Sequence, residues 1–132
     1  MEFLALQAHN LKYLCAEGGG GSVLVANRDQ IGSWETLRRI DLGDNHCAFQ
    51  TDNGHYLRAE GGGGGGVAAD SQNVGPSETF TWIWLPDNSH IALMAANGQY
   101  VCAEGGGGDG VVANRNEIGP WESFLAVVPP GG

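Results

Sequence analysis

The sequence predicts an all-β fold made of three copies of one structural unit. A block of the form Tyr-Leu-Cys-Ala-Glu followed by glycines recurs at residues 13–17, 56–60 and 100–104, at separations of 43 and 44 residues. Within each copy, short β-prone runs alternate with turn clusters, and no stretch places apolar residues at helical spacing. An open array of three copies would leave exposed sheet edges, which closure around an axis largely removes. The pattern therefore predicts a β-trefoil with pseudo-three-fold symmetry.

The repeat covers nearly all of the 132 residues, which is the length of one domain. We expect a single domain over residues 1–132, with copies at approximately 3–45, 46–89 and 90–129. Four short strands per copy give twelve strands. A three-bladed propeller is the competing closed form, but propellers typically need four or more blades. The β-prone runs of the first copy lie at residues 3–8, 13–16, 23–26 and 37–41.

Glycine runs occupy the same place in every copy, at residues 18–21, 61–66 and 105–108. Each run connects the strand that ends in Ala-Glu to the next strand, so we interpret the glycines as turn residues that tolerate positive φ. A secondary interpretation is that the missing side chains open space beside each site for a bulky ligand. A phosphate-binding loop is not indicated, because no run opens a helix or precedes Lys-Ser or Lys-Thr.

Composition limits the class of partner. Fifteen acidic and six basic side chains give a formal net charge of −9. Nucleic acids and anionic membranes need a basic footprint, so we expect neither as a partner, whereas an uncharged glycan is compatible with this charge. The sequence also lacks a run of about 18 apolar residues that would suggest a membrane span.

The ends of the chain and its cysteines bear on localisation. The N-terminus lacks the cationic start and apolar stretch of a signal peptide. The chain is therefore either cytoplasmic or a domain of a longer secreted protein, and a linker-like tail at residues 127–132 favours the secreted domain. Three cysteines do not suggest a disulfide framework. We expect Cys15, Cys47 and Cys102 to be small core residues and the protein to be a monomer.

Two Trp-Glu pairs, Trp34-Glu35 and Trp121-Glu122, are the strongest candidates for a binding site. Each tryptophan precedes by three positions the bulky residue expected to plug the core, and on a strand this odd offset points the indole outward. An exposed indole can stack on the apolar face of a pyranose, while a carboxylate accepts hydrogen bonds from sugar hydroxyls. The alternative is that these tryptophans only cover the barrel rim, beside solvated glutamates.

Further polar residues recur close to these pairs. Asn-Arg pairs just after the third strand supply donors that would complement the carboxylates; the alternative is a turn asparagine and an arginine in a local ion pair. A glutamate ends the second strand even in the copy without the tryptophan, which favours a structural role over ligand contact. These additional candidates are Asn27, Arg28, Asn114, Arg115, Glu17 and Glu104.

The middle copy departs from the pattern. Ser77 stands where the other copies have tryptophan, residues 70–71 read Asp-Ser instead of Asn-Arg, and only Glu78 remains of the pair. Trp82 and Trp84 lie nearby and either form a differently built site or only pack. We expect two competent sites and a third that is weak or altered.

Catalysis is not indicated. A glycosidase needs two carboxylates that flank one bond, whereas the acids here repeat three-fold and no unique pair stands out. The four histidines fall at scattered offsets without a metal-binding spacing, and no Gly-x-Ser-x-Gly motif occurs. We therefore expect no catalytic residue, no metal and no cofactor.

The combination of Tyr-Val-Cys-Ala-Glu, glycines, Val-Val-Ala-Asn-Arg and Ile-Gly-Pro-Trp-Glu-Ser-Phe over residues 100–124 resembles the fascin-like branch of β-trefoils. That branch includes the actin-bundling fascins and carbohydrate-binding modules for β-1,3- and β-1,6-glucans on glucan-degrading enzymes. The resemblance covers nearly the whole chain. It implies one site per repeat built on a tryptophan and a glutamate, here Trp34 with Glu35, Trp121 with Glu122, and Glu78 alone.

Two functions follow from this resemblance. The first is a non-catalytic β-glucan-binding module of a larger glycan-degrading enzyme, with weak repeat-related sites that act together. The second is filament binding of the fascin kind. Fascins use several trefoils in tandem and basic patches against acidic actin, whereas one trefoil with a charge of −9 would be repelled by actin. The charge therefore favours the glycan.

Overall fold

The computed structural model describes residues 3–108 and 110–129. This part of the chain contains twelve β-strands and five single-turn 3₁₀ helices, which confirms the predicted all-β fold. The strands are β1 (Phe3–Gln7), β2 (Tyr13–Ala16), β3 (Leu24–Arg28), β4 (Leu37–Gly43), β5 (His46–Gln50), β6 (Tyr56–Ala59), β7 (Val67–Ser71), β8 (Phe80–Trp84), β9 (His90–Met94), β10 (Tyr100–Ala103), β11 (Val111–Arg115) and β12 (Phe124–Val127). The 3₁₀ turns are η1 (Glu17–Gly19), η2 (Glu60–Gly62), η3 (Pro76–Glu78), η4 (Glu104–Gly106) and η5 (Pro120–Glu122).

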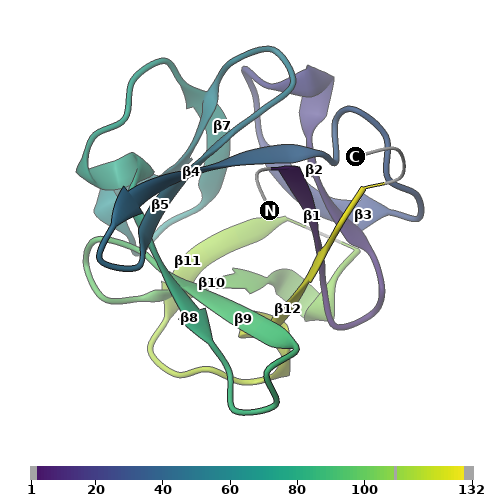
Figure 1. Cartoon of the computed structure of the whole chain (residues 1–132), viewed down its shortest axis with the longest axis vertical. Coiled ribbons are helices and arrows are strands. Elements are labelled where there is room, and N and C mark those ends of the chain that lie inside the picture. The colour runs from purple at the N-terminus through teal and green to yellow at the C-terminus, as the bar shows by residue number, and fades with distance from the viewer. Residues whose placement is uncertain (1–2, 109, 130–132) are drawn as a thin grey trace.

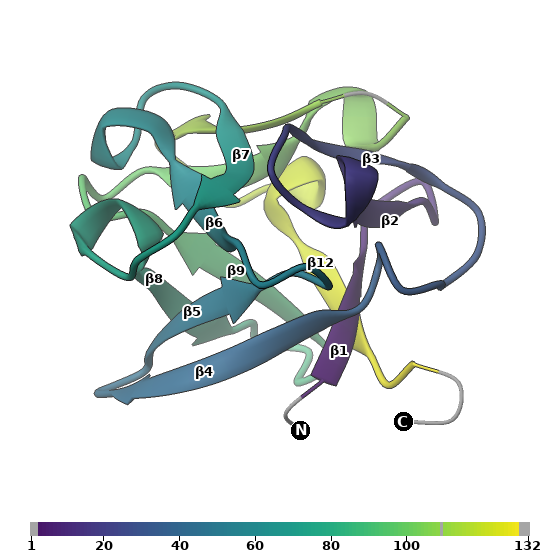
Figure 2. The same ribbon diagram turned by 90° about the horizontal axis from the view of Figure 1, so that it is seen from above.

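Six strands close into a barrel, and the other six form three hairpins that cap it. The barrel ring runs β1-β4-β5-β8-β9-β12 and returns to β1, with every neighbouring pair antiparallel. The hairpins β2–β3, β6–β7 and β10–β11 gather on one side of this barrel (Figures 1 and 2). Six barrel strands and three capping hairpins, related by approximate three-fold symmetry, constitute the predicted β-trefoil.

The core is built in layers of symmetry-related residues. The residue expected to plug the core in each copy is buried, with Leu37, Phe80 and Phe124 each exposed by no more than 1%. Each such side chain contributes roughly 2 kcal/mol by burial. Alanines fill the layer in which the hairpins approach one another, because their backbones must come close there. Further buried layers are formed by Leu6, Phe49 and Leu93, by Leu14, Leu57 and Val101, and by Ala26, Ala69 and Ala113.

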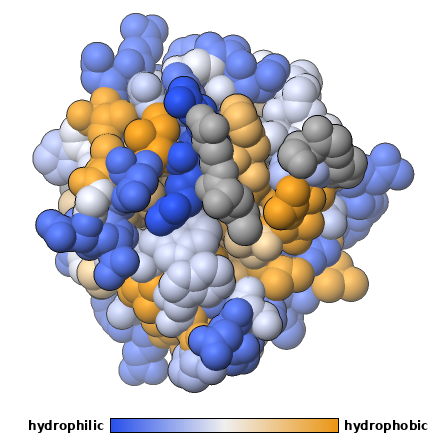
Figure 3. Space-filling view, in the orientation of Figure 1, coloured by the Kyte–Doolittle hydropathy of each residue, from blue (hydrophilic) through white to orange (hydrophobic). Residues whose placement is uncertain are grey.

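One layer breaks the symmetry. Its three equivalent positions hold Arg39, Trp82 and Ala126. Arg39 Cζ lies 4.5 Å from the centroid of the Trp82 ring, which is a cation–π contact. Trp82 is buried, and the more exposed Trp84 packs edge-on against it. Trp82 therefore packs within the core, whereas Trp84 is 57% exposed. On the face of the molecule seen in Figure 1, hydrophobic residues lie in separate patches among hydrophilic ones (Figure 3).

Some element boundaries differ from the sequence expectation. The third strand of the first copy extends to Arg28 because the ladder of the β2–β3 hairpin continues that far. Asn27 and Arg28 therefore lie within the strand and not in a turn after it. The linker interpretation of the tail is wrong for Val127, which belongs to β12 and pairs with Ala5. Residues 130–132 of that tail lie outside the described residues.

Each glycine turn is held by an asparagine of the following copy, an arrangement we call the asparagine clasp (Asn10, Asn53 and Asn97). Asn53 donates its backbone N–H to the Gly19 carbonyl at 2.9 Å and its side-chain Nδ2–H to the Gly20 carbonyl at 2.8 Å. The copies are thereby joined through backbone groups that would otherwise lack partners. The equivalent backbone bonds join Asn97 to Gly62 at 2.9 Å and Asn10 to Gly106 at 2.8 Å.

The clasp requires glycine in the turn. Gly20, Gly63 and Gly107 have φ values of 122°, 132° and 126°, a conformation that side chains disfavour. A Cβ at any of the three would overlap the side chain of the clasping asparagine. The expectation that missing side chains open space for a ligand is therefore wrong at these positions, because the neighbouring copy fills that space.

Candidate functional site

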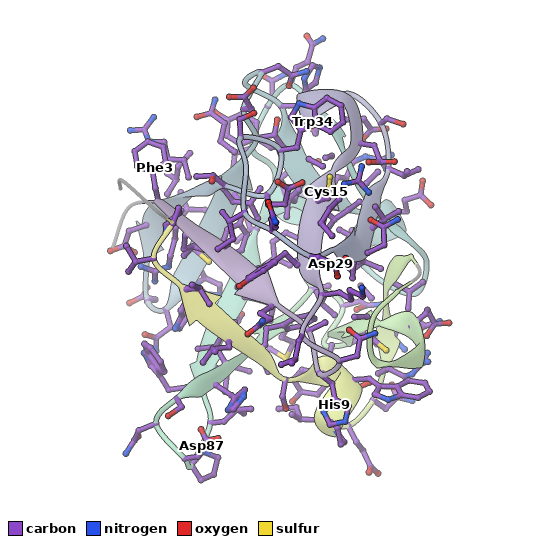
Figure 4. The ribbon with its side chains drawn as sticks, turned by 90° about the vertical axis from the view of Figure 1, so that its right-hand side faces the viewer. Phe3, His9, Cys15, Asp29, Trp34 and Asp87 are labelled. Atoms are coloured by element: carbon purple, nitrogen blue, oxygen red, sulfur yellow. The ribbon has the colours of Figure 1, made fainter. Side chains whose placement is uncertain are left out.

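The two candidate tryptophans lie in the connection between the hairpin of a copy and its last barrel strand. Trp121 is part of η5, and Trp34 occupies the equivalent turn before β4. Each side chain is 41% exposed, so the expected outward orientation is confirmed. The reason differs, since neither residue lies on a strand and the turn sets the direction of the indole. Figure 4 shows Trp34 at the edge of the molecule and Cys15 further inside.

In the first copy the indole rests against the glycine turn. A Cβ placed on Gly19 would lie 3.2 Å from Trp34 Nε1 and 3.5 Å from Asp52 Oδ2. The glycine therefore leaves room for the pyrrole edge of the indole. Asp52 belongs to the second copy, so this first-copy site (Trp34, Gly19 and Asp52) is built across a copy boundary.

The third copy repeats this geometry with a different polar group. A Cβ placed on Gly106 would lie 3.1 Å from Trp121 Nε1 and 3.4 Å from His9 Cδ2. His9 comes from the first copy, and Figure 4 shows it beside the yellow η5 turn. The third-copy site (Trp121, Gly106 and His9) thus brings together residues from near both ends of the sequence.

Sequence reasoning missed both polar neighbours of the indoles. Asp52 and His9 directly precede the clasping residues Asn53 and Asn10, and the clasp places them on the glycine turn. Aligning the three copies would have pointed to this position. All copies share an asparagine there, and the residue directly before it differs between copies: His9, Asp52 and Ala96.

The equivalent place in the middle copy has neither an aromatic nor a charged side chain. A Cβ placed on Gly62 would have two atoms within 4 Å, Ala96 Cβ at 3.9 Å and Ser77 Oγ at 4.0 Å. The middle copy therefore lacks both the tryptophan, replaced by Ser77, and its polar neighbour, replaced by Ala96. This geometry supports the expectation that only two copies carry equivalent sites.

The glutamates that follow the tryptophans point inward. Glu35, Glu78 and Glu122 are 6%, 7% and 7% exposed. Oε1 of each accepts a hydrogen bond from the backbone N–H of the glycine three residues earlier, at 2.6, 2.7 and 2.7 Å respectively. The carboxylates thus cap the turn that carries the tryptophan. The expected exposed carboxylate beside the indole is instead found at Asp52.

An arginine links these capping carboxylates to the other candidate residues. Arg28 donates to Glu17 Oε1 and to Asn27 Oδ1, both at 2.5 Å, and its Nε lies 3.8 Å from Glu35 Oε2. The arginine donors that were expected to complement the carboxylates therefore contact them within the protein itself. Ligand contact by these residues stays a prediction. In the third copy Arg115 makes the same contacts with Glu104, Asn114 and Glu122.

The middle copy keeps a charged network with its arginine moved to the partner strand. Arg58 of β6 stands where the other copies have cysteine, and Ser71 of β7 stands where they have arginine. Arg58 Nε lies 3.0 Å from Asp70 Oδ1, and its Nη2 lies 3.5 Å from Glu60 Oε2. Ser71 Oγ donates to Glu78 Oε2 at 3.0 Å. The absence of the Asn-Arg pair from the middle copy therefore accompanies a rearranged network of ion pairs and hydrogen bonds.

The three cysteines are fully buried, which confirms their expected place in the core. Burial raises the pKa of the Cys47 thiol to about 11 and that of Cys102 to about 12, and it also raises the pKa of Cys15. Hydrogen bonding to Glu122 adds to the shift at Cys102.

We expect these thiols to be unreactive toward dithiobis(nitrobenzoate) in the native protein at pH 8 and to react after denaturation. The unfolded thiols ionise near pH 9 and the folded ones at higher pH, so the folded state loses stability as the pH rises above about 9. Urea unfolding at pH 8 and pH 10.5 should show this decrease. Rapid modification of the native protein would contradict the burial of all three thiols.

Shallow depressions adjoin both tryptophan turns. They measure about 490 Å³ beside residues 28–32 and Glu35, and about 380 Å³ beside residues 115–119 and Glu122. Within residues 3–108 and 110–129, no group of three or more His, Cys, Asp or Glu side chains is arranged to hold a metal ion. None of the helices described there has the length and apolar character needed to cross a membrane.

These features define a β-trefoil whose first and third copies carry equivalent tryptophan sites across copy boundaries. By sequence, the chain belongs to the family described as "Domain of unknown function (DUF7910)", whose model matches residues 4–101. None of the curated proteins matches the chain.

Two solved structures share the fold. The designed 3-fold symmetric protein ThreeFoil is 22% identical, with a TM-score of 0.85 over 96% of this chain and 98% of ThreeFoil. SeviL, in a structure bound to asialo-GM1 saccharide, is 12% identical, with a TM-score of 0.78 over 98% of each chain. At these identities the two structures establish the fold alone.

Proposed function

We propose that the protein is a non-catalytic glycan-binding module that binds β-1,3- or β-1,6-glucan through the tryptophan sites of its first and third copies. The observation that carries this proposal is a repeated pairing on a fixed glycine turn. A partly exposed indole has a polar side chain beside it twice, Trp34 with Asp52 and Trp121 with His9. The indole would stack on the C–H face of a sugar, while the polar group bonds to its hydroxyls.

Two further observations support a glycan as the ligand. SeviL, which has the same fold, is seen bound to a saccharide. The net charge of −9 disfavours nucleic acid and actin but does not oppose a neutral polymer. The choice of a β-glucan comes from the resemblance to the glucan-binding modules of fascin-like trefoils. A module of this kind would hold a larger secreted glucan-degrading enzyme on its substrate.

The two sites would act together on a polymer. One stacked indole with a few hydrogen bonds gives a weak site, with a Kd of ~10 µM to 1 mM. Two such sites on one rigid body can engage the same chain and raise the apparent affinity ~100-fold where the geometry allows.

We expect Trp34→Ala and Trp121→Ala each to weaken retention in an affinity gel that contains soluble β-1,3-glucan, and the double variant to abolish it nearly completely. Each substitution removes one stacking surface, and the double variant also removes the gain from binding at two sites. Trp84→Ala is the matched control, because Trp84 is 57% exposed but lies outside both sites. Circular dichroism and thermal unfolding confirm that each variant is folded.

Unchanged retention of the double variant would contradict the proposal, as would an equal loss in Trp84→Ala. A gel containing β-1,6-glucan and a glycan array then distinguish the linkage. Co-sedimentation with filamentous actin, abolished by the same double substitution, would favour the fascin-like alternative.

A further inference from the structure

A hollow of about 310 Å³ lies where the three capping hairpins meet. Three isolated antiparallel bridges join strands of different copies there, and together they form a closed triangle around the pseudo-three-fold axis. The bridges pair Val23 with Ala68, Gly66 with Val112, and Gly110 with Val25. Figure 2 shows β3 and β7 on the side of the molecule opposite the start of β1. We call this feature the axial hollow, and its principal lining residues are Val23, Val25, Glu60, Gly66, Ala68 and Val112.

The walls of the axial hollow are aliphatic. Val25 and Val112 occupy equivalent positions in the first and third copies, and the middle copy has the smaller Ala68 there. Val23 is exposed at the rim, whereas the other two copies have glycine at its position. The missing side chain at Gly66 keeps the hollow open on the side of the middle copy. A ligand seated there would remove apolar surface from water.

One carboxylate stands beside these aliphatic walls. Of the described residues that line the axial hollow, Glu60 alone has a polar side chain. A Cβ placed on Gly66 would lie 3.7 Å from Glu60 Oε1, so this oxygen occupies the side of the hollow that the glycine leaves open. The first copy has Val23 at the equivalent position, where a side chain takes up the same space.

The rearranged network of the middle copy explains why this carboxylate is available. The equivalent Glu17 and Glu104 each accept a hydrogen bond of 2.5 Å from an arginine. Arg58 instead donates to both carboxylate oxygens of Asp70 and lies 3.5 Å from Glu60 Oε2. The Glu60 side chain is 55% exposed, against 36% and 38% for its equivalents. Oε2 of Glu60 thus faces the arginine, while Oε1 faces the hollow.

Aliphatic walls with a single carboxylate oxygen fit an alkylammonium group. Lysine carries a compact ammonium charge on a four-carbon stem that packs along apolar surface. A guanidinium prefers both oxygens of a carboxylate, and Oε2 of Glu60 already faces Arg58. Ligand pockets typically measure about 300–1,000 Å³, so the axial hollow has room for one side chain and not for a polymer. The net charge of −9 would also attract a basic partner.

We propose that the axial hollow is a docking site for a partner protein, which inserts one lysine side chain into it. The ammonium group bonds to Glu60 Oε1, and the stem packs against Val23, Val25 and Val112. This inference goes beyond glycan binding, because the axial hollow contains none of the residues of the two tryptophan sites. The protein could therefore hold a glycan and a basic protein at the same time.

The test titrates N-acetyl-lysine N-methylamide into the full chain and follows the valine methyl signals by NMR. We expect saturable shifts at Val23, Val25 and Val112. Glu60→Gln should weaken binding about fivefold, the upper end of what a partly exposed ion pair supplies. Acetylation of the probe's amine should have a similar effect. Asp44→Asn is the matched control, because it removes the same charge from the turn between β4 and β5 and should change binding less than twofold through screened, remote attraction.

Gly66→Val tests the position of the probe, since it gives the middle copy the residue of the first. The new Cβ would meet no atom closer than 3.7 Å, so the fold should accept it, and thermal unfolding checks this. The valine should block the hollow and weaken binding at least as much as Glu60→Gln.

Three results would overturn the inference. Equal weakening by Glu60→Gln and Asp44→Asn would show that net charge alone attracts the amine. Unchanged binding to folded Gly66→Val, or equal binding of the acetylated probe, would place the amine outside the hollow. The absence of valine methyl shifts at millimolar probe would show that the hollow does not accept a lysine side chain.

Discussion

Replacing Gly107 by alanine should lower the free energy of unfolding by about 3 kcal/mol or more, the effect of a side chain forced into a glycine-only conformation against a packed neighbour. Gly107 has φ 126° and ψ 163°. The new Cβ would also overlap the side chain of Asn10, which holds the turn of the third copy against the first. Relief of that overlap requires the asparagine clasp to open. Urea denaturation followed by tryptophan fluorescence measures the loss.

Gly105→Ala is the matched control in the same turn. Gly105 also has a positive φ, 68°, but nothing lies within 4 Å of its Cβ position. Its substitution should cost only the strain of a left-handed alanine, about 1–2 kcal/mol. Equal losses for the two variants would show that backbone strain alone, and not the clasp, makes Gly107 necessary.

Replacing Arg58 by cysteine, the residue of the other two copies, should cost about 1 kcal/mol, because the partly exposed ion pairs of Arg58 with Asp70 and Glu60 are lost. Adding Ser71→Arg restores the arrangement of the first copy and should recover at least half of the loss. Measured as a double-mutant cycle in urea, the coupling energy should be about 0.5–1 kcal/mol. Purely additive losses would contradict the exchange of the arginine between strands.

The pH dependence of the same variant provides a second readout. The hydrogen bond from Arg58 lowers the pKa of Asp70. This contribution is therefore present above the pKa of an unfolded aspartate, near 4, and is lost as the pH falls through the lower folded value. The difference in stability between the native protein and Arg58→Cys should narrow below about pH 4. A constant difference between pH 7 and pH 3 would show that the charge of Asp70 plays no part in it.

The fold could be predicted from the sequence because each copy carries the same layers at the same offsets. The recurrence of Leu37, Phe80 and Phe124 at one position identified the core plug without knowledge of any contact. The outward direction of Trp34 and Trp121 was also predicted correctly, although a turn and not a strand produces it.

The composition of the site could not be predicted in the same way. Offsets within one copy indicated Glu35 as the polar partner of Trp34, but the turn needs that carboxylate to bond the Gly32 N–H. The actual neighbour, Asp52, reaches the indole only when the copies close into a ring. These contacts form only on closure, and the position before each clasping asparagine holds a different residue in each copy, so the clasp and the polar partners were missed together.

The clasp between the first and third copies also means that the two sites can form at different times during synthesis of the chain. Trp34 and Asp52 are 18 residues apart, so a nascent chain can bring them together early. Trp121 must emerge from the ribosome before it can meet His9, 112 residues upstream. A ligand at the third-copy site would therefore bind only after β1 and β12 have paired, and its binding would stabilise that pairing.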